Sequence, residues 1–482
     1  MNSNYLPTDY QTFIATSRYA RWLDEEGRRE TWGETVSRYM TNIVMPLTGE
    51  DSYIKSIEEA ILSLEVMPSM RSLMTAGPAA ARDNTCMYNC SYLAVDNPIA
   101  FDEAMFILLC GTGVGFSVER QFIEKLPEVP TLFDSGTIVM VKDSKEGWAK
   151  AFRQILALLW AGEIPKWNVD KIRPAGARLK TFGGRASGPA PLVDLFNFAV
   201  NTFKEAQGRK LSSIECHDLM CKVGEIVVVG GVRRSAMISL SNLSDDRMRH
   251  AKSGKWYDEP QNNIYRYGYR GMANNSVAYS EKPDSMSFMR EWMALVESGS
   301  GERGIFNRQA AKKQAAKNGR RDPNREWGTN PCSEIILAGP RTDPKTGNPI
   351  AGTGGQFCNL SEVVVRATDT IEDLERKVRL ATILGTVQAT YTKFPYLRKV
   401  WEKNTSEERL LGVSLTGIMD NPLMTTANKG LAETLEHLKQ VAVDTNKEWA
   451  DRLGIEQSAA ITCVKPSGTV SQLVDSASGI HA

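Results

Sequence analysis

The sequence lacks a segment long enough to cross a membrane and lacks a secretory leader. Its longest uncharged apolar run, FILLCGTGVGFSV, has 13 residues, too few to span ~30 Å of hydrocarbon at ~1.5 Å per residue. The first residues, MNSNYLPTDYQTF, are polar and contain no apolar core of a signal peptide. We therefore expect a cytoplasmic protein with no membrane segment.

The residue types that build metal sites and disulfide frameworks are also scarce or scattered. The four histidines form no HExxH pattern, and the close cysteine pairs, CMYNC and CHDLMC, lack the two-residue spacing of zinc knuckles. A chain of 482 residues can bury a large core without disulfide bonds. We therefore predict no metal ligands, and we expect any disulfide to be catalytic.

Charge of either sign is not in excess. The 58 basic residues are balanced by 57 acidic ones, and 42% of the chain is hydrophobic. This composition gives no general attraction to nucleic acid or to a membrane surface, so neither is expected as a partner. The chain instead has the size and composition of a globular enzyme that acts on small molecules.

Residues 8–66 have apolar residues at helical spacing and predict an N-terminal helical region. Beyond them, short β-rich runs (GEIVVVGG, SAMISLSN, NSVAYS and CNLSEVVV) alternate with helices predicted at 284–297 and 371–389. This alternation favours an α/β fold, of which a barrel is one form. Residues 308–330 and 338–356 have the composition of surface loops, and the basic first one lacks the interleaved aromatics of a nucleic-acid site.

Several glycine-rich motifs could contact phosphate. GTGVGFSVE (111–119) does not match G-x-G-x-x-G and is better explained by close backbone packing. FGGRASG (182–188) and GGVRRSA (230–236) combine glycines with arginines. Either one alone would be an ordinary turn, and the two together leave a nucleotide site and plain turns equally open. KPSGTVS (465–471), after the β-like run AAITCV, is either an anion cradle or a plain turn.

The segment GTNPCSEIIL (328–337) places Cys332 between an amide and a carboxylate. Taken alone, Cys332 reads as a small buried apolar residue, with Asn330 and Pro331 in a turn and Glu334 at the start of a strand. A cysteine protease would need a histidine base, and no histidine here has a recognisable signature.

Ten motifs in order resemble those of ribonucleotide reductase, most closely the monomeric, adenosylcobalamin-dependent (class II) ribonucleoside-triphosphate reductases. They are MPSMRSL, NCSYLAV, GTGVGFSV, IRPAGARLKTFGGRASGP, GGVRRSA, NNSVA, NPCSEI, FCNLSEV, LGVSLTG and VKPSGTVS. RYARWLDEEGRRETWGETVSR also resembles the N-terminal helix of that group, and the likeness runs to the last residue.

The resemblance implies a ten-stranded α/β barrel around a central finger loop. It divides the chain into a helical region, 1–66, without an ATP-cone, and a barrel, 67–482. An insertion around 118–190 would bind effector and imitate a dimer interface. Relatives continue beyond the phosphate motif, so we expect the last barrel strand to be missing and a C-terminal companion chain to complete the enzyme.

The resemblance also implies a reaction, the reduction of ribonucleoside triphosphates to 2′-deoxyribonucleotides by a thiyl radical at Cys332. Glu334 would take a proton from the sugar and Asn330 would hold its hydroxyls. On an extended finger, residues 330, 332 and 334 would project to one side. Cys90 and Cys358 would form a disulfide as they reduce the substrate, and thioredoxin or a similar dithiol would restore them.

The remaining motifs would hold substrate and effector. The substrate residues implied by the resemblance are Ser69, Pro466, Ser467, Gly468, Thr469, Val470 and Ser471. The loops that report the dNTP effector would contain Arg173, Gly176, Arg178, Lys180, Gly183, Gly184, Arg233 and Arg234. Two alternatives stay open, a class I catalytic subunit and a non-catalytic nucleotide-binding half of a split enzyme.

Overall fold

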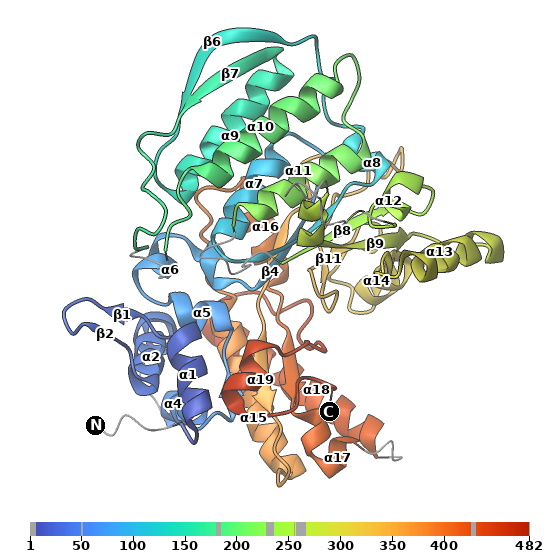
Figure 1. The fold of residues 1–482 in the computed structure, drawn as a ribbon. Coiled ribbons are helices and arrows are strands. Elements are labelled where there is room, and N and C mark those ends of the chain that lie inside the picture. Colours follow the sequence, from blue (N-terminus) through green and yellow to red (C-terminus); the bar gives the residue numbers. More distant parts are fainter. Residues whose placement is uncertain are drawn as a thin grey trace. The chain divides into compact units, whose positions relative to one another are not determined.

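A computed structural model describes residues 6–49, 52–179, 185–227, 236–254, 256, 267–425 and 430–481 (Figure 1). The chain forms two compact units. Unit 1 comprises Met1–Asn89, Lys180–Gly183 and Phe357–Ala482, and unit 2 comprises Cys90–Leu179 and Gly184–Gln356.

Unit 1 contains the predicted N-terminal helices. Its longer helices are α1 (Asp9–Arg18), α2 (Trp32–Tyr39), α4 (Ser52–Leu62), α15 (Ile371–Gln388), α16 (Lys399–Glu408) and α18 (Leu431–Leu453). A reciprocal capping box of Thr31 and Glu34 starts α2. Its strands β3 (Val66–Met67), β14 (Ser361–Val364) and β15 (Val413–Thr416) form a small sheet with β14 in the middle. The long helices α15 and α18 pack against each other.

Unit 2 contains a parallel sheet. Its strands follow the order β10 (Gly304–Asn307), β9 (Ala273–Tyr279), β8 (Met237–Asn242), β5 (Gly113–Ser117) and β4 (Cys90–Ala94). All neighbouring pairs in this series run parallel. The helices that connect or flank them are α7 (Ile99–Leu109), α9 (Lys145–Trp160), α10 (Ala190–Glu205), α11 (Ser213–Glu225), α13 (Ser285–Ser298) and α14 (Arg308–Ala316). The α/β fold predicted from the alternation of strands and helices is thus confirmed.

The two faces of β5 meet different partners. Val114 and Phe116 are fully buried, and the Phe116 ring lies 6.1 Å from that of His217 on α11. Gly115, on the opposite face, meets a hairpin made of β11 (Gly328–Thr329) and β12 (Ile336–Leu337). A Cβ atom at Gly115 would lie 1.8 Å from the Thr329 carbonyl oxygen. The predicted role of these glycines in close backbone packing is therefore confirmed.

Three local predictions from the sequence were wrong in part. Residues 308–316 form α14 rather than a loop, because Asn307 caps the helix by accepting a bond of 2.9 Å from the Ala310 amide. AAITCV contains no strand, and only Thr462 makes a single bridge, to Val413. In GEIVVVGG, α11 continues through Glu225, while residues 228–231 lie outside the described part of the chain.

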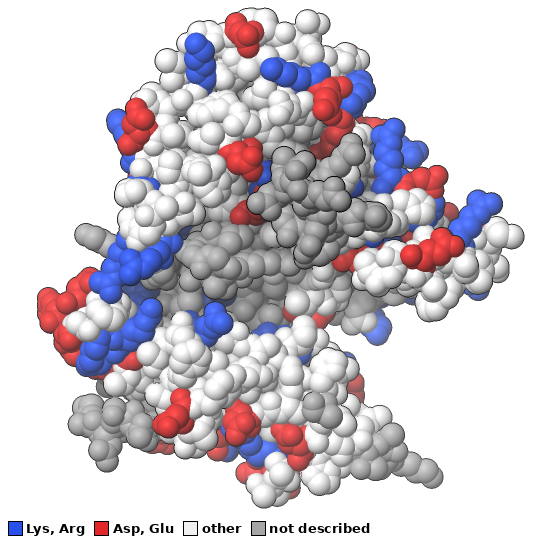
Figure 2. Space-filling model, viewed as in Figure 1, with Lys and Arg blue, Asp and Glu red and all other residues white. Residues whose placement is uncertain are grey.

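The surface drawn in Figure 2 carries basic and acidic side chains in mixture, in keeping with their near-equal numbers. Within the described residues, no helix is both long enough and apolar enough to span a bilayer.

The fit between β5 and the hairpin can be tested with Gly115→Ala. The added methyl group would collide with backbone rather than with a movable side chain, so the free energy of unfolding should fall by about 2–3 kcal/mol. Urea unfolding measures this change. In the control Gly136→Ala, on β6 (Phe133–Met140), the new Cβ has no neighbour within 4 Å, and a change of under about 0.5 kcal/mol is expected. Equal losses in both variants would contradict the close approach.

Candidate active site

The Cys332 segment forms the turn of the hairpin. The Ser333 amide donates to the Asn330 carbonyl over 3.0 Å, and Ser333 has a φ of 64°. The prediction of an extended finger with residues 330, 332 and 334 projecting to one side was therefore wrong. Strand pairing ends at Thr329 and Ile336, and the chain between them folds back on itself, so that the period of two residues does not apply.

Asn330 organises this turn from its inside. Its side chain is fully buried, its Oδ1 accepts from the Ile335 amide over 3.1 Å, and its Nδ2 donates to Glu334 Oε2 over 2.6 Å. Glu334 is partly buried, whereas Cys332 is exposed. The structure thus brings the predicted amide and carboxylate into direct contact and leaves the thiol exposed within the same turn.

Cys90 lies on the same side of the sheet as the hairpin. It begins β4 and pairs with Gly113 of β5. Tyr92, two residues along β4, faces the hairpin, since a Cβ atom on Gly328 would lie 2.0 Å from its ring. Side chains two apart on a strand share a face, so that Cys90 also points to the hairpin side. The ring of Pro331 lies 3.0 Å from the Cβ position of Gly113, which places the hairpin turn at the end of the sheet where Cys90 lies.

The other predicted redox cysteine, Cys358, belongs to unit 1. It is fully buried and ends β13 (Gln356–Cys358). The preceding Phe357 packs in an aromatic cluster, with ring centroids 4.7 Å from Phe394 and 4.8 Å from Trp401. Cys358 therefore projects away from that cluster.

Ser69, also in unit 1, caps a helix. It is buried and precedes α5 (Met70–Thr75), where its hydroxyl oxygen accepts from the Ser72 amide over 3.3 Å. The same hydroxyl lies 3.1 Å from the Met87 carbonyl oxygen and 2.5 Å from Asn89 Oδ1.

The predicted phosphate segment of unit 1 is anchored by a residue that the sequence did not single out, Glu362. This buried carboxylate on β14 accepts from Ser467 Oγ over 2.6 Å and, through its other oxygen, from the Lys465 ammonium. A single charged residue in the strand-like run NLSEVVV was the available signal. The rest of the segment comprises Pro466 and Gly468, followed by Thr469, Val470 and Ser471 in the short helix α19 (Thr469–Val474).

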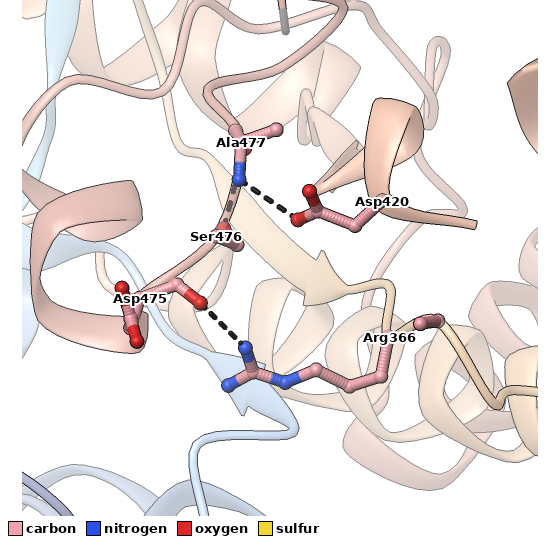
Figure 3. Close-up of a pocket in the computed structure, with 6 residues that line it drawn as sticks. Arg366, Asp420, Asp475, Ser476 and Ala477 are labelled. Carbon is pink, nitrogen blue, oxygen red and sulfur yellow. Dashed lines mark hydrogen bonds between the residues drawn. The ribbon is translucent and has the colours of Figure 1, made fainter.

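Side chains of unit 1 also bind the backbone just after this segment, at residues 474–477 (Figure 3). The Arg366 guanidinium donates to the Asp475 carbonyl over 2.8 Å and to the Val474 carbonyl over 2.7 Å. Asp420 accepts from the Ala477 amide over 2.8 Å. The segment is therefore fixed at both ends by side chains of unit 1.

Only part of the predicted effector loops lies in the described residues. Arg173 donates to Asp143 over 2.7 Å, the Gly176 amide donates to the Ala186 carbonyl over 2.8 Å, and Arg178 forms an antiparallel bridge with Arg185. The remaining predicted positions lie outside the described residues, namely Lys180, Gly183, Gly184, Arg233 and Arg234.

Comparisons with known proteins identify this fold. Residues 125–203 match a family model for the insertion domain of B12-dependent ribonucleotide reductase. A crystal structure of a B12-dependent (class II) ribonucleotide reductase aligns with a TM-score of 0.78 at 22% identity, covering 97% of this chain and 74% of that one. The alpha subunit of an Actinobacillus ureae class Id enzyme aligns less well, with a TM-score of 0.57 at 12% identity. The chain has the ribonucleotide reductase fold, as its motifs predicted.

The curated relatives show which type of ribonucleotide reductase this chain is similar to. Proteins named adenosylcobalamin-dependent ribonucleoside-triphosphate reductase include one from Lacticaseibacillus paracasei, 27% identical over 96% of this chain and 71% of its own length. Another, from Lactobacillus leichmannii, is 28% identical over 96% of this chain and 72% of its own length. The predicted relationship is confirmed: the chain is a homologue of the class II, adenosylcobalamin-dependent ribonucleotide reductases.

The anchoring by Glu362 predicts the effect of Glu362→Gln. The substitution leaves the Lys465 ammonium without its anionic partner next to a buried strand, so the free energy of unfolding should fall by about 1–3 kcal/mol. The control Glu26→Gln breaks an exposed ion pair with Arg28 and should cost under about 1 kcal/mol. Thermal unfolding of both variants measures the difference, and a Glu362→Gln variant as stable as the control would refute the anchoring role.

Proposed function

We propose that this protein reduces ribonucleoside triphosphates to 2′-deoxyribonucleoside triphosphates, with adenosylcobalamin as cofactor and dNTPs as effectors of substrate choice. The observation that carries the proposal is the hairpin turn, where an exposed thiol, a buried amide and a carboxylate lie together in a homologue of reductases bearing that name.

Each group of the turn has a role in starting the reaction. The Cys332 thiyl radical takes the hydrogen atom from the 3′ carbon of the ribose, and the S–H bond that forms is close in strength to the C–H bond that breaks. Glu334 accepts the proton of the 3′ hydroxyl as the 2′ hydroxyl leaves as water. Asn330 holds the sugar hydroxyls through its amide.

Two further thiols complete the reduction. Cys90 and Cys358 together give two electrons and two protons, and a disulfide bond forms between their sulfur atoms. One proton completes the departing water, the other proton and the two electrons become the new hydrogen at the 2′ carbon, and Glu334 returns its proton to the 3′ oxygen. The hydrogen atom on Cys332 then returns to the 3′ carbon, which regenerates the thiyl radical. A thioredoxin-type dithiol reduces the disulfide for the next turnover.

One property of the chain, the exposure of the Cys332 thiol, agrees with the proposed cofactor. Adenosylcobalamin, when bound, supplies the radical chemistry that oxidises a thiol to a thiyl. The thiol that must react, Cys332, is exposed, whereas Cys86, Cys90, Cys110, Cys216, Cys221 and Cys358 are buried. Cys332 is therefore the thiol, among these seven, that a cofactor would meet at the surface.

Substrate and effector would use the other predicted segments. Ser69 and residues 466–471 of unit 1 would bind the substrate and its phosphates. The loops around Arg173, Gly176 and Arg178, together with the positions outside the described residues, would respond to a dNTP effector.

The assay combines the protein with adenosylcobalamin, dithiothreitol, an NTP and a dNTP effector, and quantifies deoxynucleotide by chromatography. Cys332→Ala should lower product formation at least about 1,000-fold, since it removes the thiol that takes the hydrogen atom in the proposed reaction. The matched control is Cys463→Ala, which removes a partly exposed thiol with no assigned role and should retain activity.

Other outcomes separate the alternatives. Effector binding without turnover under every condition would support a non-catalytic nucleotide-binding protein. Turnover that requires a metal-containing radical subunit in place of adenosylcobalamin would support a class I catalytic subunit.

A further inference from the structure

Three arginines of unit 2 donate to backbone carbonyl groups in or beside the strands of the Cys332 hairpin. Arg308 Nε donates to the Trp327 carbonyl over 2.7 Å, and Arg321 donates to the Ile336 carbonyl over 2.9 Å. Arg325 Nε donates to the Gly339 carbonyl over 2.6 Å. All three arginines are buried, so the hairpin is held by its backbone and from within the unit.

Arg308 is the most enclosed of the three. It is fully buried, and its two terminal nitrogens form a fork with Glu119 at 2.7 and 2.5 Å. A terminal nitrogen also lies 3.1 Å from Glu326. Glu119 lies just after β5, and Arg308 begins α14 directly after β10. One guanidinium therefore ties two strand ends of the sheet to the base of the hairpin.

An ion pair this deeply buried is a costly way to gain stability. Removing both charges from water costs several kcal/mol, and apolar residues of the same volume often stabilise a core as well or better. Burial alone would raise the pKa of Glu119, but the charge and hydrogen bonds of Arg308 hold it below its ordinary value. What the pair does provide is a fixed geometry, because a guanidinium fork binds a carboxylate in one plane.

The segment between Trp327 and Cys332 is short and tightly packed, so the position of Trp327 affects the position of the thiol. Next to Trp327, Gly328 packs against the Tyr92 ring, and Thr329 packs against Gly115 so closely that neither glycine has room for a Cβ atom. Pro331, with its restricted backbone, directly precedes Cys332. Because these residues are tightly packed or restricted in conformation, a displacement of the backbone at Trp327 would also displace Cys332.

We propose that Arg308 is a positioning residue for Cys332: its fork with Glu119 and its bond to the Trp327 carbonyl set where the hairpin holds the thiol. The inference rests on the proposed function for the role of Cys332. Hydrogen transfer between sulfur and carbon depends steeply on distance, and a misplacement of ~1 Å can cost ~100-fold in rate.

The test compares Arg308→Lys with Arg303→Lys. Arg303 is a matched control because it is also buried, also forms a fork with a glutamate (Glu291, 2.5 and 3.0 Å) and also donates to backbone carbonyls, but those belong to Asn242 and Leu243 rather than to the hairpin. Lysine keeps the charge at both positions and removes the fork.

Two measurements are made on the full chain. Amide hydrogen exchange, followed by mass spectrometry without cofactor or substrate, should be at least about tenfold faster for the hairpin peptide in Arg308→Lys only. In the reductase assay, Arg308→Lys should lower kcat by about 10- to 100-fold with the KM for NTP within about twofold of the parent protein. Arg303→Lys should leave both the hairpin exchange and kcat near those of the parent.

The inference is overturned if the hairpin of Arg308→Lys exchanges as slowly as that of the parent, or if both variants lose kcat in proportion to their lost stability. Should Arg308→Lys fail to fold, Glu119→Gln replaces it, since it removes the charge of the fork and keeps a similar side-chain volume. It should show the same selective hairpin exchange. If the parent protein forms no deoxynucleotide, the proposed function fails, while the exchange comparison still decides whether Arg308 orders the hairpin.

Discussion

The contact between β5 and the hairpin is the constraint on which the arrangement of unit 2 depends. At Gly115 the Thr329 carbonyl oxygen occupies the place of a side chain, and at Gly328 the Tyr92 ring does so. Backbone can approach backbone this closely only where Cβ atoms are missing. The glycines thus set how closely the hairpin approaches the sheet, and the contact of the Pro331 ring with Gly113 sets the end of the sheet at which its turn lies.

The sequence predicted those features of the fold that are determined by residues close together in the chain. Helical periodicity predicted α13 and α15 closely, and the glycine spacing of GTGVGFSV correctly indicated close packing. The prediction from the sequence was wrong at residues 308–316, where the lysines and arginines suggested a solvated loop. The Asn307 cap starts a helix there, and Arg308 turns inward to a partner 189 positions away. A pairing over that separation leaves no local pattern.

The candidate site was predictable in composition but not in shape. The motif match singled out Asn330, Cys332 and Glu334, yet the expectation of an extended finger missed the turn that brings the first and last of them into contact. Glu362 was overlooked for a related reason, because its partners Lys465 and Ser467 lie more than a hundred positions further along the chain. In each case the residues were visible in the sequence, and the contacts between them were not.

The bond between Asn330 and Glu334 has a consequence for a ligand that enters the turn. While no ligand is bound, the Asn330 amide donates to the partly buried Glu334 carboxylate, in the place that a hydroxyl group of the ligand would take. Under the proposed function, a sugar hydroxyl would take over that place while the amide turned to the same ligand, so one hydrogen bond would be exchanged for another at little net cost. The turn therefore already contains, between its own side chains, the type of hydrogen bond that the proposed function requires with a substrate.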